Sequence, residues 1–368
     1  MFLLDETPVL YHAPWDQTLD QRLLALSRGD LRVAYLYEVL DSGTFRYRVY
    51  NMIQALSAQP DVSGAFFTIK EVEALYQVLP EIDTLIVCRV RYGRALEQVI
   101  RRARELGKRI LYDIDDLVFD LDYVHLIANT LGFSDEDSTW DFWFAYAARM
   151  AAALKLCDLV ITTNAYLAER VQAFSCKATA VIPNFLNQQQ LTISESLFAQ
   201  KQARHFARSE QVMIGYFSGS ATHNRDFDLI AGELAKILDR HPEVRVRIVG
   251  LLDPKGLRWY SNRIETHPLQ DFVNLQRLIA TTEINVVPLQ YNAFTNCKSE
   301  LKYFEAAIVG TLTIASPTFT LKNAIRDGHT GFLARSFEWQ EKIERVLQSF
   351  ADYPAMAEQA FVDARERY

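Results

Sequence analysis

The sequence predicts an α/β protein built from two doubly wound domains. Short apolar runs alternate with segments whose apolar residues recur at helical spacing, which is typical of parallel sheets covered by helices. The alternation occurs twice, and a polar stretch rich in Gln and Ser, residues 186–210, separates the two runs. The length of 368 residues suits about two domains of ~150 residues each. Because ligands bind beyond the carboxyl ends of parallel strands, we expect a site in the cleft between the domains.

Composition and charge exclude several classes of protein. Apolar residues make up 49% and charged residues 23%, as in ordinary globular chains. A net charge of −7 makes nucleic acid an unexpected partner. There is no run of about 18 apolar residues and no secretory signal at the start, so we expect a cytoplasmic protein. The four cysteines form no Cys-x-x-Cys pair, which indicates free thiols rather than a metal site.

The first run of the alternation covers residues 31–185 and follows an N-terminal extension, residues 1–30. Six short apolar segments are expected as strands, at residues 32–37, 65–69, 84–88, 109–114, 158–162 and 178–182. Helical spacing is expected at residues 49–56, 72–78, 92–106 and 140–155. This half therefore predicts one parallel sheet with helical crossovers.

The second run covers residues 211–350. Expected strands are residues 212–217, 244–249, 284–288 and 312–315, and expected helices are residues 227–238, 271–280 and 299–309. Residues 186–210 have few apolar positions in register, so we expect a linker or a loosely packed connection there.

A candidate anion site follows the first strand of the second run. Ser218 and Gly219 lead from that strand into a helix, and Ser220, His223 and Arg225 follow in the same loop. The glycine permits close approach of a ligand, and the free N–H groups at the helix start favour a phosphate. The alternative is an ordinary strand-to-helix turn with its own N-cap.

A second candidate lies further along the second run. Lys298, Lys302 and Glu305 have the spacing of one helix face. Two cations and a carboxylate after a buried strand suit a nucleoside diphosphate, with the lysines on phosphate and the carboxylate on ribose hydroxyls. A solvated helix face is the alternative.

In the first run, acidic residues follow the fourth strand. Asp113 and Asp115 should share one side at its carboxyl end, where Asp113 would shape an acceptor site. Asp115 or Asp116 could accept a hydrogen bond from an acceptor hydroxyl or assist its deprotonation. His125 is a further candidate for this side of the site. Helix capping, a pair with Arg109 and a structural histidine are the alternatives.

Two more segments carry weaker signals. Gly43, Thr44 and Arg46 lie in the loop after the first strand, where Arg46 is suited to an anionic contact; an ordinary turn is the alternative. The arginine-rich stretch 89–109 is typical of a solvated face, although it could also meet an anionic membrane surface. The aromatic residues at 140–146 are more typical of core or interdomain packing than of a sugar platform.

Several of these segments resemble a known family. Residues 298–316 resemble the donor-binding helix of GT-B-type glycosyltransferases, the retaining group called family four, through Lys302-x-x-Glu305 and the strand that follows Gly310. Residues 325–333 are similar to its Asp-Gly-x-x-Gly-Phe-Leu loop, and residues 214–227 resemble the opening of its second domain. The chain departs from the Glu-x7-Glu form of the pattern, because Cys297 stands where the first glutamate would be.

The resemblance implies a GT-B fold, with two Rossmann-like domains facing each other across a cleft. It implies transfer of a sugar from a nucleotide-sugar donor, held by the second domain, to a hydroxyl of a carbohydrate or lipid-linked acceptor, with retention of configuration. No metal or other cofactor is implied, because cationic side chains and helix ends neutralise the leaving diphosphate. Polysaccharide or glycolipid synthesis, peripheral association with the inner face of a membrane and a terminal helix (residues 351–368) that crosses back to the first domain are implied by the same analogy.

Two rival functions stay open on the sequence. One is a catalytically silent module that binds a partner glycosyltransferase, which the missing carboxylate at Cys297 favours. The other is a sugar-nucleotide epimerase, which would need no acceptor. Convergence of Lys302, Glu305 and Asp115 on one cavity would argue against a silent module.

Overall fold

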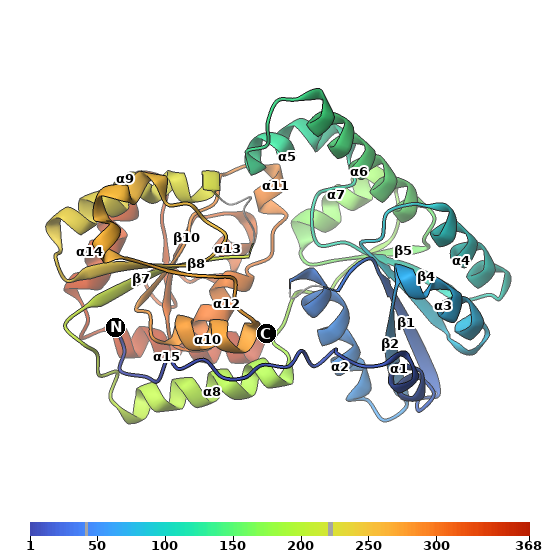
Figure 1. Ribbon diagram of the computed structural model, residues 1–368, viewed down its shortest axis with the longest axis horizontal. Coiled ribbons are helices and arrows are strands. Elements are labelled where there is room, and N and C mark those ends of the chain that lie inside the picture. Colours follow the sequence, from blue (N-terminus) through green and yellow to red (C-terminus); the bar gives the residue numbers. More distant parts are fainter. Residues whose placement is uncertain (41–42, 220–223) are drawn as a thin grey trace.

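The computed structural model describes residues 1–40, 43–219 and 224–368. It has two α/β domains side by side, each with a six-stranded parallel sheet, which confirms the predicted fold class (Figure 1). The first sheet has the order β2-β1-β3-β4-β5-β6. Its strands are β1 (Leu31–Tyr37), β2 (Val62–Thr68), β3 (Thr84–Cys88), β4 (Arg109–Asp113), β5 (Leu159–Thr162) and β6 (Thr179–Val181).

The second sheet has the order β12-β11-β10-β7-β8-β9. Its strands are β7 (Val212–Ser218), β8 (Val244–Gly250), β9 (Ile264–His267), β10 (Ile284–Val287), β11 (Leu312–Ala315) and β12 (Phe332–Leu333). Strands β9 and β12 escaped the sequence prediction because both are short and only half of their residues or fewer are buried. Strand β7, by contrast, is buried throughout, which explains its continuous apolar run.

The strand order reverses once in each sheet. Strand β1 lies between β2 and β3, and strand β7 lies between β8 and β10. In doubly wound sheets such a reversal leaves a crevice at the carboxyl ends of the two diverging strands, where ligands bind. The loops after β1, β3 and β7 are therefore the segments that the topology brings to the cleft.

Helices cover both faces of the sheets. In the first domain they are α1 (Leu19–Leu26), α2 (Asn51–Ser57), α3 (Val72–Val78), α4 (Arg94–Glu105), α5 (Val124–Leu131), α6 (Asp137–Lys155) and α7 (Ala165–Ser175). A π-helical turn, Arg46–Tyr50, precedes α2. The remaining helices are α8 (Gln188–Ala203), α9 (Asn224–Arg240), α10 (Phe272–Ala280), α11 (Ala293–Asn296), α12 (Leu301–Ala307), α13 (Phe319–Ala324), α14 (Trp339–Gln348) and α15 (Tyr353–Arg367).

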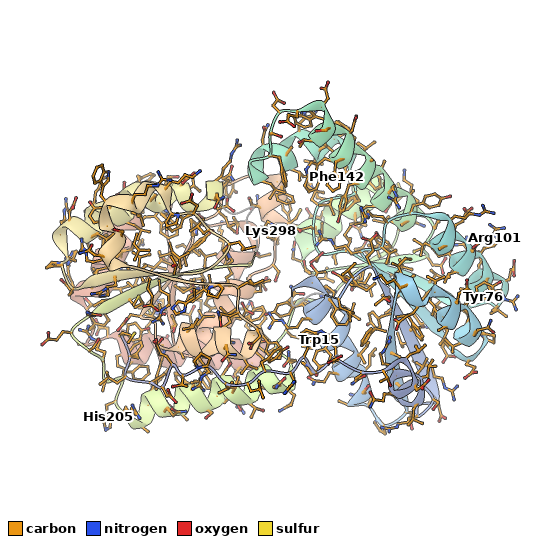
Figure 2. The ribbon with its side chains drawn as sticks, viewed as in Figure 1. Trp15, Tyr76, Arg101, Phe142, His205 and Lys298 are labelled. Carbon is orange, nitrogen blue, oxygen red and sulfur yellow. The ribbon has the colours of Figure 1, made fainter. Side chains whose placement is uncertain are left out.

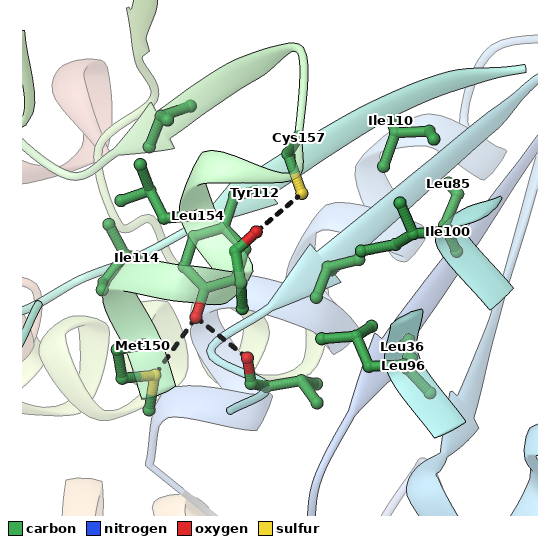
Figure 3. Packing of buried hydrophobic residues seen from close by; sticks show 14 of the residues in the cluster. Leu36, Leu85, Leu96, Ile100, Ile110, Tyr112, Ile114, Met150, Leu154 and Cys157 are labelled. Carbon is green, nitrogen blue, oxygen red and sulfur yellow. Dashed lines mark hydrogen bonds between the residues drawn. The ribbon is translucent and has the colours of Figure 1, made fainter. Parts of the chain in front are cut away.

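The core of the first domain combines apolar packing with satisfied polar groups (Figure 3). Tyr112 on β4 is fully buried, and its hydroxyl donates to the carbonyl of Val90 at 3.0 Å. Leu36, Leu85 and Ile110 pack in the same cluster from three neighbouring strands. A hydroxyl this deep in the core costs little because it has a partner.

The stretch between the domains differs from the expected loose connection. Residues 188–203 form α8, and Leu197 and Phe198 on it are buried against the second domain. Polar residues on the same helix are buried as well, among them Gln190 and Lys201. Because polar residues occupy buried positions, the helix lacks the apolar periodicity by which a packed helix is predicted from sequence.

Both ends of the chain pack on the second domain. The backbone N–H of Phe2 donates to the carbonyl of Thr281, and the first residues run beneath this domain toward the first one (Figure 1). Helix α15 packs on α12 and β11 of the second domain, and its end reaches the boundary with the first domain, where the Leu186 N–H donates to the Tyr368 carbonyl at 2.8 Å. Its buried residues, such as Ala357 and Ala360, join the apolar clusters of the second domain, which fixes it there.

A separate structural finding concerns membranes. Within the described ranges, no helix combines the length and the apolar character needed to cross a bilayer.

Candidate functional site

A cavity of about 500 Å³ lies between the two domains, at the carboxyl ends of the strands. It brings together most of the residues that the sequence singled out from both domains. The second domain contributes Ser218, Gly219, Lys298, Lys302 and Glu305, and the first contributes Gly43, Thr44, Arg46, Asp115 and Asp116. Figure 2 places Lys298 between the domains.

Two lysines give the second-domain wall its positive charge. Lys302 lies on α12, with its Nζ 5.1 Å from the centroid of the Tyr216 ring. Burial lowers the pKa of Lys302 to about 8, against the opposing effect of Asp226. Lys298 precedes α12, so it does not share the helix face that the spacing predicted, yet it lines the same cavity. Two cations in a partly desolvated cavity favour an anionic ligand.

Glu305 on α12 connects the domains. Its Oε1 accepts from Nη2 of Arg46 at 3.0 Å, from the Tyr47 hydroxyl at 2.5 Å and from the Gln190 amide at 3.3 Å. Arg46 and Glu305 each have only 6% of the side chain exposed. Arg46 was expected to meet an anionic ligand, but in the structure it forms an ion pair with Glu305.

The opposite wall is built around Asp115. Its carboxylate accepts from the Thr44 hydroxyl and from Nη1 of Arg89, both at 2.9 Å. Burial opposes ionisation, but Arg89 and the hydrogen bond from Thr44 outweigh it, so the pKa of Asp115 lies below its ordinary value. Asp115 is therefore held as a carboxylate at neutral pH, ready to accept a hydrogen bond.

The sequence reasoning missed Arg89, which it had placed in a solvated basic stretch. Arg89 lines the cavity and has a positive φ of 53°, an uncommon conformation for a non-glycine residue. Its position in the sequence could have identified it, because Arg89 directly follows β3. Strand β3 lies beside β4 in the sheet, so the residues that follow the two parallel strands lie at the same edge.

Asp113 is a structural residue rather than part of the acceptor side. It forms two hydrogen bonds of 2.9 Å with Arg48, and both side chains are almost fully buried. The cavity lining among the described residues does not include it. The predicted shared side fails because β4 ends at Asp113, and beyond a strand end the alternation of side chains no longer holds.

Two more predicted residues lie away from the described cavity lining. His125 is exposed on α5, with its ring centroid 4.7 Å from that of Trp140. Arg225 donates a hydrogen bond to the carbonyl of Asn129 in the first domain. Ser220 and His223 were also predicted to bind the donor, but they lie outside the described residues.

Cys297 takes part in interdomain packing. It is fully buried and, with Phe294, joins the apolar cluster of the first domain. Its backbone carbonyl accepts from Nδ2 of Asn164 at 2.7 Å. Burial raises the pKa of its thiol. A glutamate in this apolar contact would bear the desolvation cost of a buried charge, which is a physical reason for the neutral side chain.

Comparison with known proteins connects this site to a family. Residues 212–352 match the family described as Glycosyl transferases group 1. A D-inositol 3-phosphate glycosyltransferase of Streptomyces griseus is 29% identical over 165 residues, which cover 40% of this chain and 34% of that protein. The counterpart of Streptomyces coelicolor is also 29% identical, over 161 residues. The chain thus spans about a third of the length of these curated relatives.

Solved structures match over nearly the whole chain. Anabaena HepE in complex with UDP superposes with a TM-score of 0.60 at 15% identity and covers 92% of this chain and 96% of that one. Sucrose-phosphate synthase from Thermosynechococcus elongatus gives a TM-score of 0.60 at 16% identity and covers 91% and 94%. The chain therefore has the GT-B fold, and residues 212–352 are similar to the glycosyl transferases group 1 family.

Proposed function

We propose that this protein is a glycosyltransferase that moves a sugar from a nucleoside diphosphate sugar to a hydroxyl acceptor in the interdomain cleft. One observation carries the proposal: a single cavity joins cations of the second domain, Lys298 and Lys302, to the carboxylate of Asp115 in the first. The two lysines suit a diphosphate, and the Asp115 carboxylate suits a hydroxyl.

The donor side uses residues of the second domain. Ser218 ends β7 and Gly219 follows it, both lining the cavity, where the glycine lets a phosphate approach the backbone closely. Lys298 and Lys302 would stabilise the charge that develops on the diphosphate as it leaves, so we propose that the reaction needs no metal or other cofactor. Glu305 would meet the ribose hydroxyls, in competition with its present partners Arg46 and Tyr47.

The acceptor side uses residues of the first domain. In the transfer, the bond between the sugar C1 and the phosphate oxygen breaks, and a bond from C1 to the acceptor oxygen forms on the same face. The acceptor proton passes to the departing diphosphate. Because the pKa of Asp115 is lowered, we propose that Asp115 orients the hydroxyl by accepting its hydrogen bond. Asp116, 3.4 Å from Nζ of Lys298, would connect the two halves of the site.

Similar proteins support the donor class. Three of the matching Anabaena HepE structures contain UDP, UDP with glucose or UDP-glucose. UDP is therefore the first nucleotide to test.

A thermal-shift titration with UDP, GDP, ADP, CDP and dTDP tests the donor site. A ligand at about 100 times its Kd adds about 2.7 kcal/mol to the stability of the folded state and raises Tm. We expect one nucleotide to raise Tm, and Lys302→Ala and Lys298→Ala to abolish the rise. Lys236→Ala is the matched control, because Lys236 is exposed on α9 and pairs only with Glu233 among the described carboxylates.

The outcomes separate the three functions. No rise with any nucleotide would overturn the proposal in favour of a silent module that binds a partner enzyme. A rise together with conversion of the donor sugar in the absence of acceptor would indicate the epimerase. If Tm still rises with the nucleotide in both lysine variants, the nucleotide binds at a site other than the one lined by Lys298 and Lys302.

We do not extend the proposal to peripheral association with a membrane at the inner face. The basic residues for such an association would come from α4, which lies at the edge of the first domain far from the cleft (Figures 1 and 2). Three of these arginines already face carboxylates, at 4.0 Å for Arg101–Glu97, 3.2 Å for Arg102–Glu105 and 3.6 Å for Arg104–Asp158. This pairing favours the solvated-face interpretation of the arginine-rich stretch.

A further inference from the structure

Four aromatic side chains, two exposed and two half-buried, form one cluster beside the mouth of the cleft. Phe133, Phe142, Trp143 and Tyr146 come from the end of α5 and the first half of α6, and we call them the aromatic ledge. None of the four is buried, and Phe142 is 52% exposed. The sequence favoured core or interdomain packing for this helix; Trp143 and Tyr146 are half-buried against the first-domain core, whereas Phe142 and Phe144 are exposed. Large apolar groups left exposed in one cluster indicate a binding surface.

Trp143 is the centre of the ledge. Its ring centroid lies 5.2 Å from that of Phe133, 5.6 Å from that of Phe142 and 5.5 Å from that of Tyr146. Rings at these distances hold one another in place, so the surface is ordered before any ligand arrives. Preorganised aromatic rings bind at a low cost in side-chain entropy.

The ledge is continuous with the reaction cavity. Trp143 lines the cavity together with Leu131 and Val118, and Asp115 lies on the same wall. In Figure 1, α5 and the start of α6 overhang the gap between the domains, and Figure 2 shows Phe142 on this overhang. Hydrogen bonds fix the overhang to the second domain, because Gln290 donates to the carbonyl of Thr130 at 2.9 Å and Asn292 donates to its hydroxyl at 3.0 Å.

The charges around the ledge narrow the class of ligand. Residues 133–146 contain Asp135, Glu136, Asp137 and Asp141 but no Lys or Arg. All four carboxylates are exposed. From outside this segment, Arg91 lies 5.4 Å from the centroid of the Tyr146 ring, but its charge is paired with Glu38 at 2.8 Å. Such a surface repels anionic headgroups and polyanions. Exposed carboxylates accept hydrogen bonds from hydroxyls, and the C–H face of a sugar ring packs on the electron-rich face of an aromatic ring.

We propose that the aromatic ledge binds the acceptor as a neutral oligosaccharide of several residues. The terminal hydroxyl would reach Asp115, and the following sugar rings would pass over Trp143 and outward along Phe142. The placement of the terminal hydroxyl at Asp115 rests on the proposed function. Binding of the saccharide to the ledge does not require that sugar transfer occurs. It assigns a polymeric carbohydrate, rather than a lipid surface or a small polyol, to the acceptor side.

Binding to an array of immobilised neutral and acidic oligosaccharides tests the proposal on the full chain, with UDP present. We expect binding to neutral oligosaccharides of at least three or four sugars. Trp143→Ala should weaken binding of the best one by about tenfold or more in calorimetry, as is typical when a central aromatic contact is removed. Phe142→Ala should weaken it by a smaller factor. Since Phe142 is exposed, that variant is expected to fold even if Trp143→Ala does not.

Trp259→Ala is the matched control, because Trp259 is 95% exposed on the second domain and away from the ledge. It should leave saccharide binding unchanged. Equal weakening by Trp259→Ala, or an array without any bound oligosaccharide, would overturn the proposal. Sedimentation with phosphatidylglycerol vesicles is run in parallel. Vesicle binding that Phe142→Ala abolishes, with no saccharide bound, would assign the ledge to a lipid surface instead. The rise in Tm with UDP is measured separately, so a negative result for saccharide binding at the ledge does not contradict the proposed donor site.

Discussion

Lys302 shows how a single charge is adjusted by its surroundings. Lys302 lines the cavity together with Lys298, and its ammonium group lies 5.1 Å from the centroid of the Tyr216 ring. Desolvation lowers the pKa of Lys302 to about 8, so Lys302 is partly neutral near that pH. A bound dianion would reverse this effect by favouring the protonated form.

The binding of UDP should therefore take up a proton near pH 8. The free protein has Lys302 with a pKa of about 8, and the bound diphosphate raises it, so affinity falls as pH rises through that value. Calorimetric titrations at pH 8 in Tris and in HEPES, which differ in ionisation enthalpy, should give different observed heats. Lys302→Arg keeps the charge at all these pH values and should remove the difference. Identical heats for the unmodified protein in the two buffers would contradict the linkage.

At the scale of elements, α8 is a helix whose stability comes from its contacts. Lys201 is 1% exposed, and its Nζ donates to the carbonyl of Gly310 at 3.0 Å and to the hydroxyl of Thr311 at 3.2 Å. Phe198 stacks on Phe361 of α15, with ring centroids 4.0 Å apart and an interplanar angle of 8°. These contacts join the segment between the domains to the last helix, so tertiary packing offsets the weak apolar pattern of α8.

Phe198→Ala should destabilise the protein by about 3–5 kcal/mol, because it removes a buried ring and leaves a cavity between α8 and α15. Urea denaturation followed by circular dichroism measures the change. Phe337→Ala is the control: this ring is 77% exposed, and its removal should alter stability by less than about 0.5 kcal/mol. Similar midpoints for the two variants would show that α8 is not packed as described.

At the scale of the whole molecule, the domains share buried contacts on both sides of the cleft. Phe272 and Val273 of the second domain join a first-domain cluster that includes Trp15 and Phe45. The Arg46–Glu305 pair adds a charge contact across the same boundary. A buried ion pair gives little net stability, but loss of one partner leaves an uncompensated charge.

Arg46→Met should therefore lower the stability by about 3 kcal/mol or more, because Glu305 would stay buried without its cation. The double variant Arg46→Met/Glu305→Leu should recover much of that loss. Arg101→Met, which removes an exposed arginine 4.0 Å from Glu97, should have an effect within about 1 kcal/mol. Thermal unfolding of the three variants measures the comparison. A double variant less stable than Arg46→Met would contradict an uncompensated charge as the cause.

The sequence by itself determined the two parallel sheets, because strands buried on both faces read as continuous apolar runs such as residues 212–217. It also determined which loops meet at the cleft, since topology fixes where Ser218, Lys302 and Asp115 must lie. Only the tertiary structure decided what each side chain does there. Asp113 forms a hydrogen bond of 2.9 Å with Arg48, which is 65 residues away in the sequence. Glu305 forms one of 3.0 Å with Arg46, which is 259 residues away. Local spacing carries no information on such distant pairs, nor on whether the aromatic residues of α6 face the core or the solvent.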